Sequence, residues 1–241
     1  MKKIVAITQA RIGSIRLPGK VLKKIGDETL LDIHLNRVLG AKCIDELVLA
    51  TTYHEKDDSI AKIGKQRGIS TYRGSEEDVL DRYYQAAKST GADIIIRITS
   101  DCPLIDPLVI DKILMEHLKH KKDFTSNIIA RSYPDGMDVE IFNMNVLERA
   151  WKESTTKSDR EHVTHYIWKN SDLQKKNLFT AHNVAAENNI NHSDIRMTLD
   201  YLQDYEMFKK LIDILGTNRT WLEYAKFLKG NSVIRAINQN L

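Results

Sequence analysis

Short apolar strands alternate regularly with amphipathic helices through the first half of this chain, and this rhythm constrains the fold more than any other feature. Strand patterns rich in Ile, Val and Leu cover residues 3–9, 46–51 and 93–98, and a short strand is predicted over 69–72. Helical patterns cover residues 29–42, 57–67, 76–89 and 107–118. The order indicates an α/β protein with a mainly parallel sheet, helices on both faces and right-handed crossovers.

The rhythm loosens after about residue 120. Strands are predicted over 124–130 and 137–142, and helices over 145–152, 159–170, 202–215 and 221–228. A late strand over 195–199 is expected to return to the sheet, parallel to the first. We find no repeat or linker, so we predict one domain over residues 1–241. Its excursion near 125–185 is expected to shape a substrate pocket or a dimer contact.

Composition excludes several classes of function. The net charge of +3 comes without a basic stripe interleaved with aromatics, which argues against nucleic acid as a partner. No apolar run approaches the length of a membrane helix. Only Cys43 and Cys102 occur, outside any CxxC pair, which fits a reducing cytoplasm. The apolar stretch at the N-terminus is too short for a signal peptide, so a first strand is expected there.

The loop after the first strand, residues 10–20, is strongly cationic. It carries Arg11, Arg16 and Lys20, with Gly13 and Gly19 to permit unusual backbone angles. Ligands of open α/β sheets bind at this edge, and clustered cations favour an anion such as a triphosphate. The spacing matches neither a Walker A loop nor a dinucleotide-binding fingerprint. A solvated basic loop without a ligand is the alternative interpretation.

The segment Ala-Arg-x-x-Ser-x-Arg-Leu-Pro-Gly-Lys at 10–20 resembles the cytidylyltransferases that make CMP-Kdo and CMP-sialic acid. Further segments resemble the branch that serves spore-coat polysaccharide biosynthesis, at residues 72–82, 97–107, 134–140, 159–164 and 195–200. The resemblance implies a Rossmann-like nucleotide-diphospho-sugar transferase fold, a homodimer, and transfer of CMP from CTP to an acidic sugar of the Kdo or nonulosonate kind. Pyrophosphate would be released, in the service of cell-surface polysaccharide biosynthesis.

The same resemblance assigns roles to residues. It implies Mg²⁺ held by Asp101 and Asp200, with Arg16, Lys20 and Asp101 as catalytic residues. Nucleotide contacts are expected from Ala10, Arg11, Ser14, Lys20, Ser75 and Arg82. Asp101, Asp200 and Ser75 could instead be helix caps, since Asp and Ser are preferred there. The Kdo and sialate enzymes carry a Ser-Gly-Thr-Asp-Arg type segment where this chain has Gly74-Ser75 and a later Asp81-Arg82, so the resemblance does not fix the acceptor.

Residues for the acceptor are expected further along the chain. Asp138 and Glu140 stand two apart on a predicted strand and therefore share one face. They could bind acceptor hydroxyls or a second metal ion, or simply face solvent. Arg160, Glu161, His162 and Arg196 could recognise a carboxylate or deprotonate a hydroxyl. Cys102 is expected to be a small buried residue, since no neighbouring base is evident.

Alternative functions remain open at this point. CMP could be transferred to a phosphate, a phosphonate or another small acceptor. A glycosyltransferase using a nucleotide sugar is a second class, because Asp138-Val139-Glu140 resembles a DxD metal motif. A protein that binds nucleotide without turnover is a third.

Overall fold

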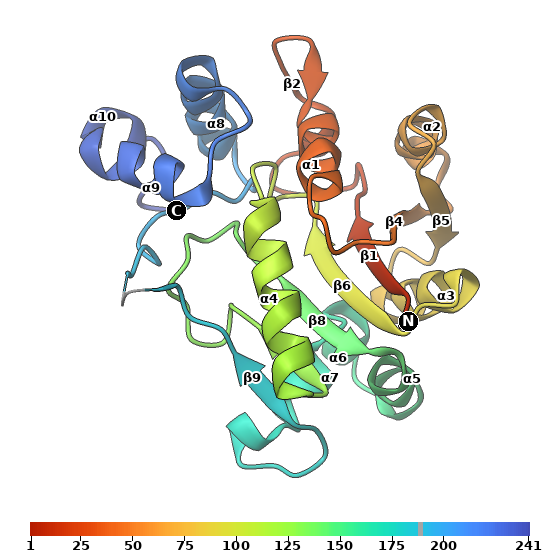
Figure 1. Ribbon diagram of the computed structural model, residues 1–241. Helices are drawn as coiled ribbons and strands as arrows, with labels where there is room; N and C mark the ends of the chain where they lie inside the picture. Colours follow the sequence, from red (N-terminus) through yellow and green to blue (C-terminus); the bar gives the residue numbers. More distant parts are fainter. Residues whose placement is uncertain (188–189) are drawn as a thin grey trace.

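The computed structural model describes residues 1–187 and 190–241, and a central seven-stranded sheet organises them (Figure 1). The strand order is β5-β4-β1-β6-β8-β7-β9. The strands are β1 (Ile4–Gln9), β4 (Glu46–Thr52), β5 (Ser70–Gly74), β6 (Ile94–Thr99), β7 (Phe124–Ser126), β8 (Glu140–Asn143) and β9 (Ala181–Asn183). A small hairpin of β2 (Lys24–Ile25) and β3 (Glu28–Thr29) lies outside this sheet.

One half of the sheet is parallel and the other half mixed. Strand β1 pairs in parallel with β4 and β6, and β4 pairs in parallel with β5. Strand β8 runs antiparallel to both β6 and β7, while β9 is parallel to β7. The predicted mainly parallel α/β architecture is therefore confirmed. The segment predicted as an excursion contributes β8 and β9 to the same sheet.

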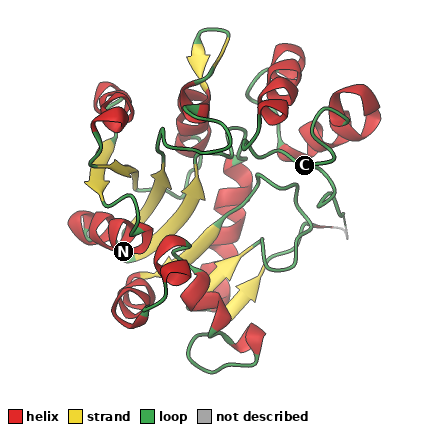
Figure 2. Ribbon diagram, turned by 180° about the vertical axis from the view of Figure 1, so that it is seen from behind, coloured by secondary structure: helices red, strands yellow, loops and turns green. Residues whose placement is uncertain are grey.

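Helices cover both faces of the sheet (Figure 2). The longer ones are α1 (Leu30–Leu39), α2 (Asp58–Gln66), α3 (Val79–Thr90), α4 (Pro107–His120), α5 (Met144–Glu153), α8 (Leu202–Leu215) and α9 (Trp221–Gly230). The shorter ones are α6 (Lys157–Glu161), α7 (His165–Lys169) and α10 (Ser232–Arg235). Side-chain caps begin many of them: Thr29 caps α1 in a capping box with Asp32, and Asp106 precedes Pro107 at α4. None of the described helices is long and apolar enough to cross a membrane.

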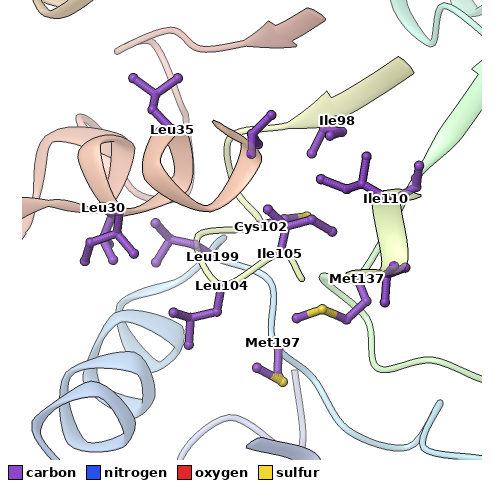
Figure 3. Packing of buried hydrophobic residues seen from close by; sticks show 14 of the residues in the cluster. Leu30, Leu35, Ile98, Cys102, Leu104, Ile105, Ile110, Met137, Met197 and Leu199 are labelled. Carbon is purple, nitrogen blue, oxygen red and sulfur yellow. The ribbon is translucent and has the colours of Figure 1, made fainter. Parts of the chain in front are cut away.

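Two hydrophobic clusters occupy the two faces of the sheet. On β1, Ala6 belongs to the first cluster, whereas Val5 and Ile7 belong to the second, as strand alternation requires. The first cluster packs beneath α1 and α4 and is shown in Figure 3. The second packs beneath α3 and α5. This double burial explains why the central strands are apolar throughout.

The helix predicted over 159–170 is interrupted, and that prediction is wrong in detail. Helix α6 ends at Glu161 and α7 begins at His165, with Val163 between them at a φ of 38°. The break buries the Val163 side chain completely and lets the Thr164 hydroxyl donate to the buried carboxylate of Glu140, at 2.5 Å. Tertiary packing therefore overrides local helix preference here.

The late strand predicted over 195–199 is also wrong. Strand β8 already occupies the edge beside β6, so the segment has no place in the sheet. It instead lies against two loops: the Met197 N–H donates to Asp135 O (2.6 Å) and the Leu199 N–H donates to Asp101 O (2.8 Å). Gly136, at a φ of 105°, permits this approach, because a Cβ there would lie 2.1 Å from Met197 O.

Candidate functional site

A cavity of about 550 Å³ opens at the carboxyl ends of β1 and β6, where ligands of open α/β sheets bind. Its lining brings together the basic loop, the start of α3, the end of β6 and the loop between α6 and α7. The residues are Gln9, Ala10, Arg11, Ser14, Ile15, Arg16, Lys20, Val21, Val79, Arg82, Arg97, Thr99, Ser100, Asp101, Glu161, His162 and Asp200. Five cationic side chains face three carboxylates, which gives the cavity a net positive lining suited to an anionic ligand.

The basic loop is held by its own backbone and by one buried carboxylate. The Ile12 N–H donates to Asp57 Oδ1 at 2.7 Å, and the Gly19 N–H donates back to Ile12 O at 3.0 Å. Gly19 adopts a φ of 65°, and Leu17 is buried as an anchor. These contacts shape the loop while Arg11 and Arg16 stay exposed. The cations are thus presented to the cavity by a preformed backbone.

Lys20 lies between the two carboxylates that the sequence singled out. Its ammonium donates to Leu199 O (2.7 Å) and Asp200 Oδ1 (2.9 Å), and it lies 3.5 Å from Asp101 Oδ2. Arg16 forms a second ion pair with Asp200 at 2.7 Å. Burial tends to raise the pKa of the Asp200 carboxyl, but Lys20, Arg16 and Arg196 outweigh burial and hold that pKa below its usual value.

Asp200 reaches the cavity without a strand to carry it. The buried Asp204 accepts from the backbone N–H groups of Asp200 (2.8 Å) and Tyr201 (2.9 Å) at the start of α8. Arg196 donates two hydrogen bonds of 2.9 Å each to the Asp204 carboxylate. Arg196 therefore acts through Asp204 to position the turn that presents Asp200. Its predicted place in the acceptor pocket is not what the structure shows, because Arg196 does not line the cavity.

Asp101 lies directly after β6 on a turn supported by a buried histidine. His34 lies on α1, with Nε2 at 2.7 Å from Thr8 Oγ1 and Nδ1 at 2.9 Å from Cys102 O. Because the carbonyl can only accept, Nδ1–H donates to it and Nε2 accepts from the Thr8 hydroxyl. Burial lowers the pKa of His34 to about 4. The neutral ring thus connects α1 to the turn that carries Asp101.

The segment after β5 leads into α3, which lines the cavity with Val79 and Arg82. Ser75 Oγ accepts from the N–H groups of Glu77 (3.2 Å) and Asp78 (3.1 Å) and so closes the turn before α3, whose N-cap is Asp78. Ser75 is therefore not the helix cap, and it does not line the cavity. Arg82 is buried, lines the cavity and donates from Nη1 to Ser75 O at 2.5 Å. Desolvation by burial lowers the pKa of this guanidinium.

Three buried polar atoms of the lining have no protein partner among residues 1–187 and 190–241. They are Gln9 Oε1, Arg82 Nε and Arg97 Nε. A buried polar group without a partner costs about 1–3 kcal/mol. These three atoms have almost no accessible surface, so they lie behind the surface of the cavity.

The residues predicted for the acceptor separate into two groups. Glu161 and His162 line the cavity, from the end of α6 and the break that follows it. Arg160 does not; it donates from Nε to Asp78 Oδ2 (2.9 Å) and from Nη1 to Trp151 O (2.7 Å). These contacts fasten α6 to α3 and α5.

Asp138 and Glu140 share one face, as alternation predicts, because Met137, Val139 and Ile141 all lie in the first hydrophobic cluster. Neither carboxylate lines the cavity. Asp138 pairs with Arg131 through bonds of 2.7 and 2.9 Å near the surface. Only Glu140 lies within strand β8, where it is buried and paired with Arg97.

The pair of Arg97 and Glu140 supports the floor of the cavity. Burial disfavours the charge on Arg97, but the Glu140 carboxylate outweighs it and raises the pKa of the guanidinium above its usual value. Arg97 is therefore a permanent, partly buried cation in the lining. Sequence reasoning overlooked it, together with Gln9 and Thr99. The available signal was a polar residue at the end of an otherwise apolar strand.

Cys102 is buried beside Asp101, as predicted. Burial, followed by the nearby Asp101 carboxylate, raises the pKa of its thiol well above the usual value. The thiol therefore stays protonated, and it lacks the thiolate character that a nucleophile requires.

Comparison with known proteins decides the family. The family model described as cytidylyltransferase matches residues 5–235. This chain belongs to the cytidylyltransferase family. It is accordingly a CTP-dependent nucleotidyltransferase, and the predicted family resemblance and enzyme class are confirmed.

Individual relatives of this cytidylyltransferase extend the comparison. The spore coat polysaccharide biosynthesis protein SpsF of Bacillus subtilis is 35% identical over 221 residues, which is 90% of this chain and 89% of that protein. A solved cytidylyltransferase from Leptospira borgpetersenii is 34% identical, has a TM-score of 0.91, and matches 100% of this chain and 98% of its own. CMP:2-keto-3-deoxy-manno-octonic acid synthetase, solved with CTP, shares the fold at 17% identity and a TM-score of 0.64, over 88% and 99% of the two chains.

Proposed function

We propose that this cytidylyltransferase moves CMP from CTP to an acidic sugar of the Kdo or nonulosonate kind, with release of pyrophosphate, for cell-surface polysaccharide biosynthesis. One observation carries the proposal: Lys20, Asp101 and Asp200 form a charged cluster at the C-terminal end of the basic loop, inside a single cavity. Nucleotidyl transfer needs cations along a triphosphate and carboxylates for a metal ion at the same place.

The cluster around Lys20 fits a divalent cation. Oxygen atoms of Asp101, Asp200 and Leu199 surround the Lys20 ammonium at 2.7–3.5 Å. This group of oxygen atoms therefore already stabilises a positive charge, that of Lys20. Mg²⁺ prefers oxygen ligands and takes one or two carboxylates from a protein. We therefore assign Asp101 and Asp200 as its ligands. Bound there, Mg²⁺ would neutralise charge on the triphosphate and on the leaving pyrophosphate.

The basic loop is assigned to the triphosphate. Arg11 and Arg16 offer planar forks for phosphate oxygens, and Lys20 offers a point charge on a flexible stem. The acceptor oxygen attacks the α-phosphorus, a P–O bond forms, the bond between the α-phosphorus and its bridging oxygen breaks, and pyrophosphate leaves. Lys20 and Arg16 stabilise the charge that develops on these oxygens. Ala10, Ser14 and Arg82 line the same cavity as the basic loop and are assigned to the nucleotide.

The acceptor is assigned to the side of the cavity formed by Arg97, Glu161 and His162. Arg97 lines this cavity and provides a fixed positive charge for an acidic acceptor. Glu161 or His162 takes the proton of the attacking hydroxyl. The name of the 2-keto-3-deoxy-manno-octonic acid synthetase supports an acidic sugar, and the name of SpsF supports a role in polysaccharide biosynthesis. A phosphate or phosphonate acceptor would satisfy the same charges and belongs in any substrate screen.

Asp101→Asn tests the assignment. The side chain is partly exposed and only 3.5 Å from Lys20, so the fold should survive its neutralisation. Turnover measured as pyrophosphate release should fall by roughly two orders of magnitude or more, because an electrostatic group is lost from the reacting centre. Asp213→Asn, an exposed change on α8, is the matched control and should keep wild-type turnover. Wild-type turnover in a well-folded Asp101→Asn enzyme would contradict the metal assignment.

A further inference from the structure

A second group of potential metal ligands lies at the edge of the sheet, away from the nucleotide cavity. Glu116 and His120 stand one turn apart on α4, so they share a face of that helix. His182 lies on the edge strand β9, which runs beside the C-terminal part of α4 (Figure 1). One ligand atom from each of the three lies within 4.8 Å of the other two. None of the three lines the cavity described above.

The distances within this cluster match those between ligands of a tetrahedral ion. Glu116 Oε2 lies 3.1 Å from His120 Nε2 and 3.9 Å from His182 Nε2. Ligands about 2.0–2.2 Å from a tetrahedral ion are separated by roughly 3.3–3.6 Å. The imidazole rings stack with centroids 4.2 Å apart and an interplanar angle of 28°. Binding therefore requires the imidazole rings to turn out of this stack, so that all three ligand atoms reach one centre.

The ligand chemistry points to a borderline transition metal. Two imidazoles and one carboxylate form the donor set that zinc enzymes use with an open fourth position. Mg²⁺ and Ca²⁺ prefer all-oxygen sites, so the nitrogen ligands separate this cluster from Asp101 and Asp200. The three side chains are only 25%, 38% and 29% exposed, which limits the freedom they lose when an ion binds.

Two cations, Lys119 and Lys122, act on His182 and oppose an ion at this place. The Lys119 ammonium lies 3.4 Å from Glu116 Oε1 and would compete with a metal for the carboxylate. Its side chain is 67% exposed and can swing into solvent. Exposed ion pairs of this kind contribute about 0–1 kcal/mol, much less than three metal bonds. Lys119 therefore lowers the affinity for the metal ion without preventing its binding. Removing this charge should raise the affinity, which can be measured.

We propose that Glu116, His120 and His182 bind one divalent transition-metal ion of the zinc class, with water at the fourth position. The ion ties α4 to β9. Strand β9 is three residues long and, among residues 1–187 and 190–241, pairs only with β7, so a metal bond to His182 adds a second attachment for this edge. This site is structural and independent of nucleotidyl transfer.

Titration of the tag-free enzyme with Co²⁺ tests the proposal. Tetrahedral Co²⁺ with nitrogen ligands absorbs strongly in the visible, whereas an octahedral oxygen site absorbs weakly, so the spectrum separates this cluster from the nucleotide cavity. The enzyme carrying Asp101→Asn and Asp200→Asn should still bind one equivalent with the strong spectrum. Zn²⁺ should displace the Co²⁺ and raise the melting temperature.

Variants decide which residues hold the ion. His120→Gln and His182→Gln should each weaken Zn²⁺ binding by about 100-fold or more, since even an outer-shell partner is worth 10–100-fold. Lys119→Gln should tighten it roughly two- to fivefold. His54→Gln is the matched control, an exposed histidine paired with a single glutamate, and should change nothing. Absence of the strong spectrum in the wild type, or its persistence in His182→Gln, would overturn the proposal.

Discussion

Acidification should expose the energetic role of His34, the buried ring between α1 and the turn that carries Asp101. Its pKa is about 4 in the folded chain, against about 6.5 for an unperturbed histidine. The unfolded chain therefore binds more protons between these values, and stability falls as the pH falls. A difference of this size corresponds to on the order of 3 kcal/mol between pH 7 and pH 4.

The structural cause is a ring whose two nitrogens are both engaged. The neutral ring accepts from Thr8 and donates to Cys102 O with no exposed surface. Protonation puts a charge in this buried place and removes the acceptor that the Thr8 hydroxyl uses. His34→Gln removes the titration, so the free energy of unfolding of the variant should depend less on pH.

Urea unfolding of both proteins at pH 7 and pH 4 measures this effect. The difference between wild type and His34→Gln in free energy of unfolding should shrink by on the order of 3 kcal/mol at the lower pH. Carboxylates titrate in both proteins and cancel in the comparison. His54→Gln, which alters an exposed histidine, should follow the wild type. A difference that stays constant within about 1 kcal/mol would refute a neutral, buried His34.

Two further substitutions test the supports of the cavity. Glu140→Gln leaves the partly buried Arg97 charge without its partner and should cost about 3–5 kcal/mol in urea unfolding, whereas Glu153→Gln at an exposed pair should leave stability unchanged. Gly136→Ala places a Cβ 2.1 Å from a carbonyl at a positive φ, so it should cost roughly 2–5 kcal/mol and lower turnover by displacing the segment that leads to Asp200. Gly230→Ala, where a Cβ meets nothing within 4 Å, should be silent in the same melting and activity assays.

The first half of the fold could be predicted from sequence because its signals are local. Strands β1, β4 and β6 are apolar runs, and α1 and α3 between them have their own period and side-chain cap, so the parallel pattern needs no long-range information. The basic loop was identified for the same reason, since its cations lie close together in sequence. Asp101 could be placed at the same edge once β6 was recognised as a neighbour of β1.

Features that depend on distant partners escaped prediction. Ile195, Met197 and Leu199 are buried, as their alternation in the sequence indicates. The segment nevertheless packs against loops at Asp101 and Asp135 and forms no strand of the sheet. Similarly, nothing near Val163 in sequence predicts its positive φ, because the break is imposed by packing beneath α6 and by Glu140.

Several charged residues that were predicted to bind the acceptor do not line the cavity. Arg160 and Arg196 form ion pairs with Asp78 and Asp204 that fasten helices and turns, and Glu140 neutralises a partly buried arginine. A charge pattern alone does not distinguish a ligand contact from a structural pair, because both use the same side chains. Only the tertiary partners reveal which role each residue has.

Nucleotide choice tests the central claim most directly. Purified enzyme with Mg²⁺ should be offered CTP, UTP, ATP and GTP separately, against Kdo, nonulosonates and small phosphorylated acceptors, with pyrophosphate release as the readout. We predict release that requires CTP together with an acidic sugar, and its loss in Asp101→Asn. Release driven equally by other nucleotides, or a protein that neither turns over CTP nor is stabilised by it, would contradict the account.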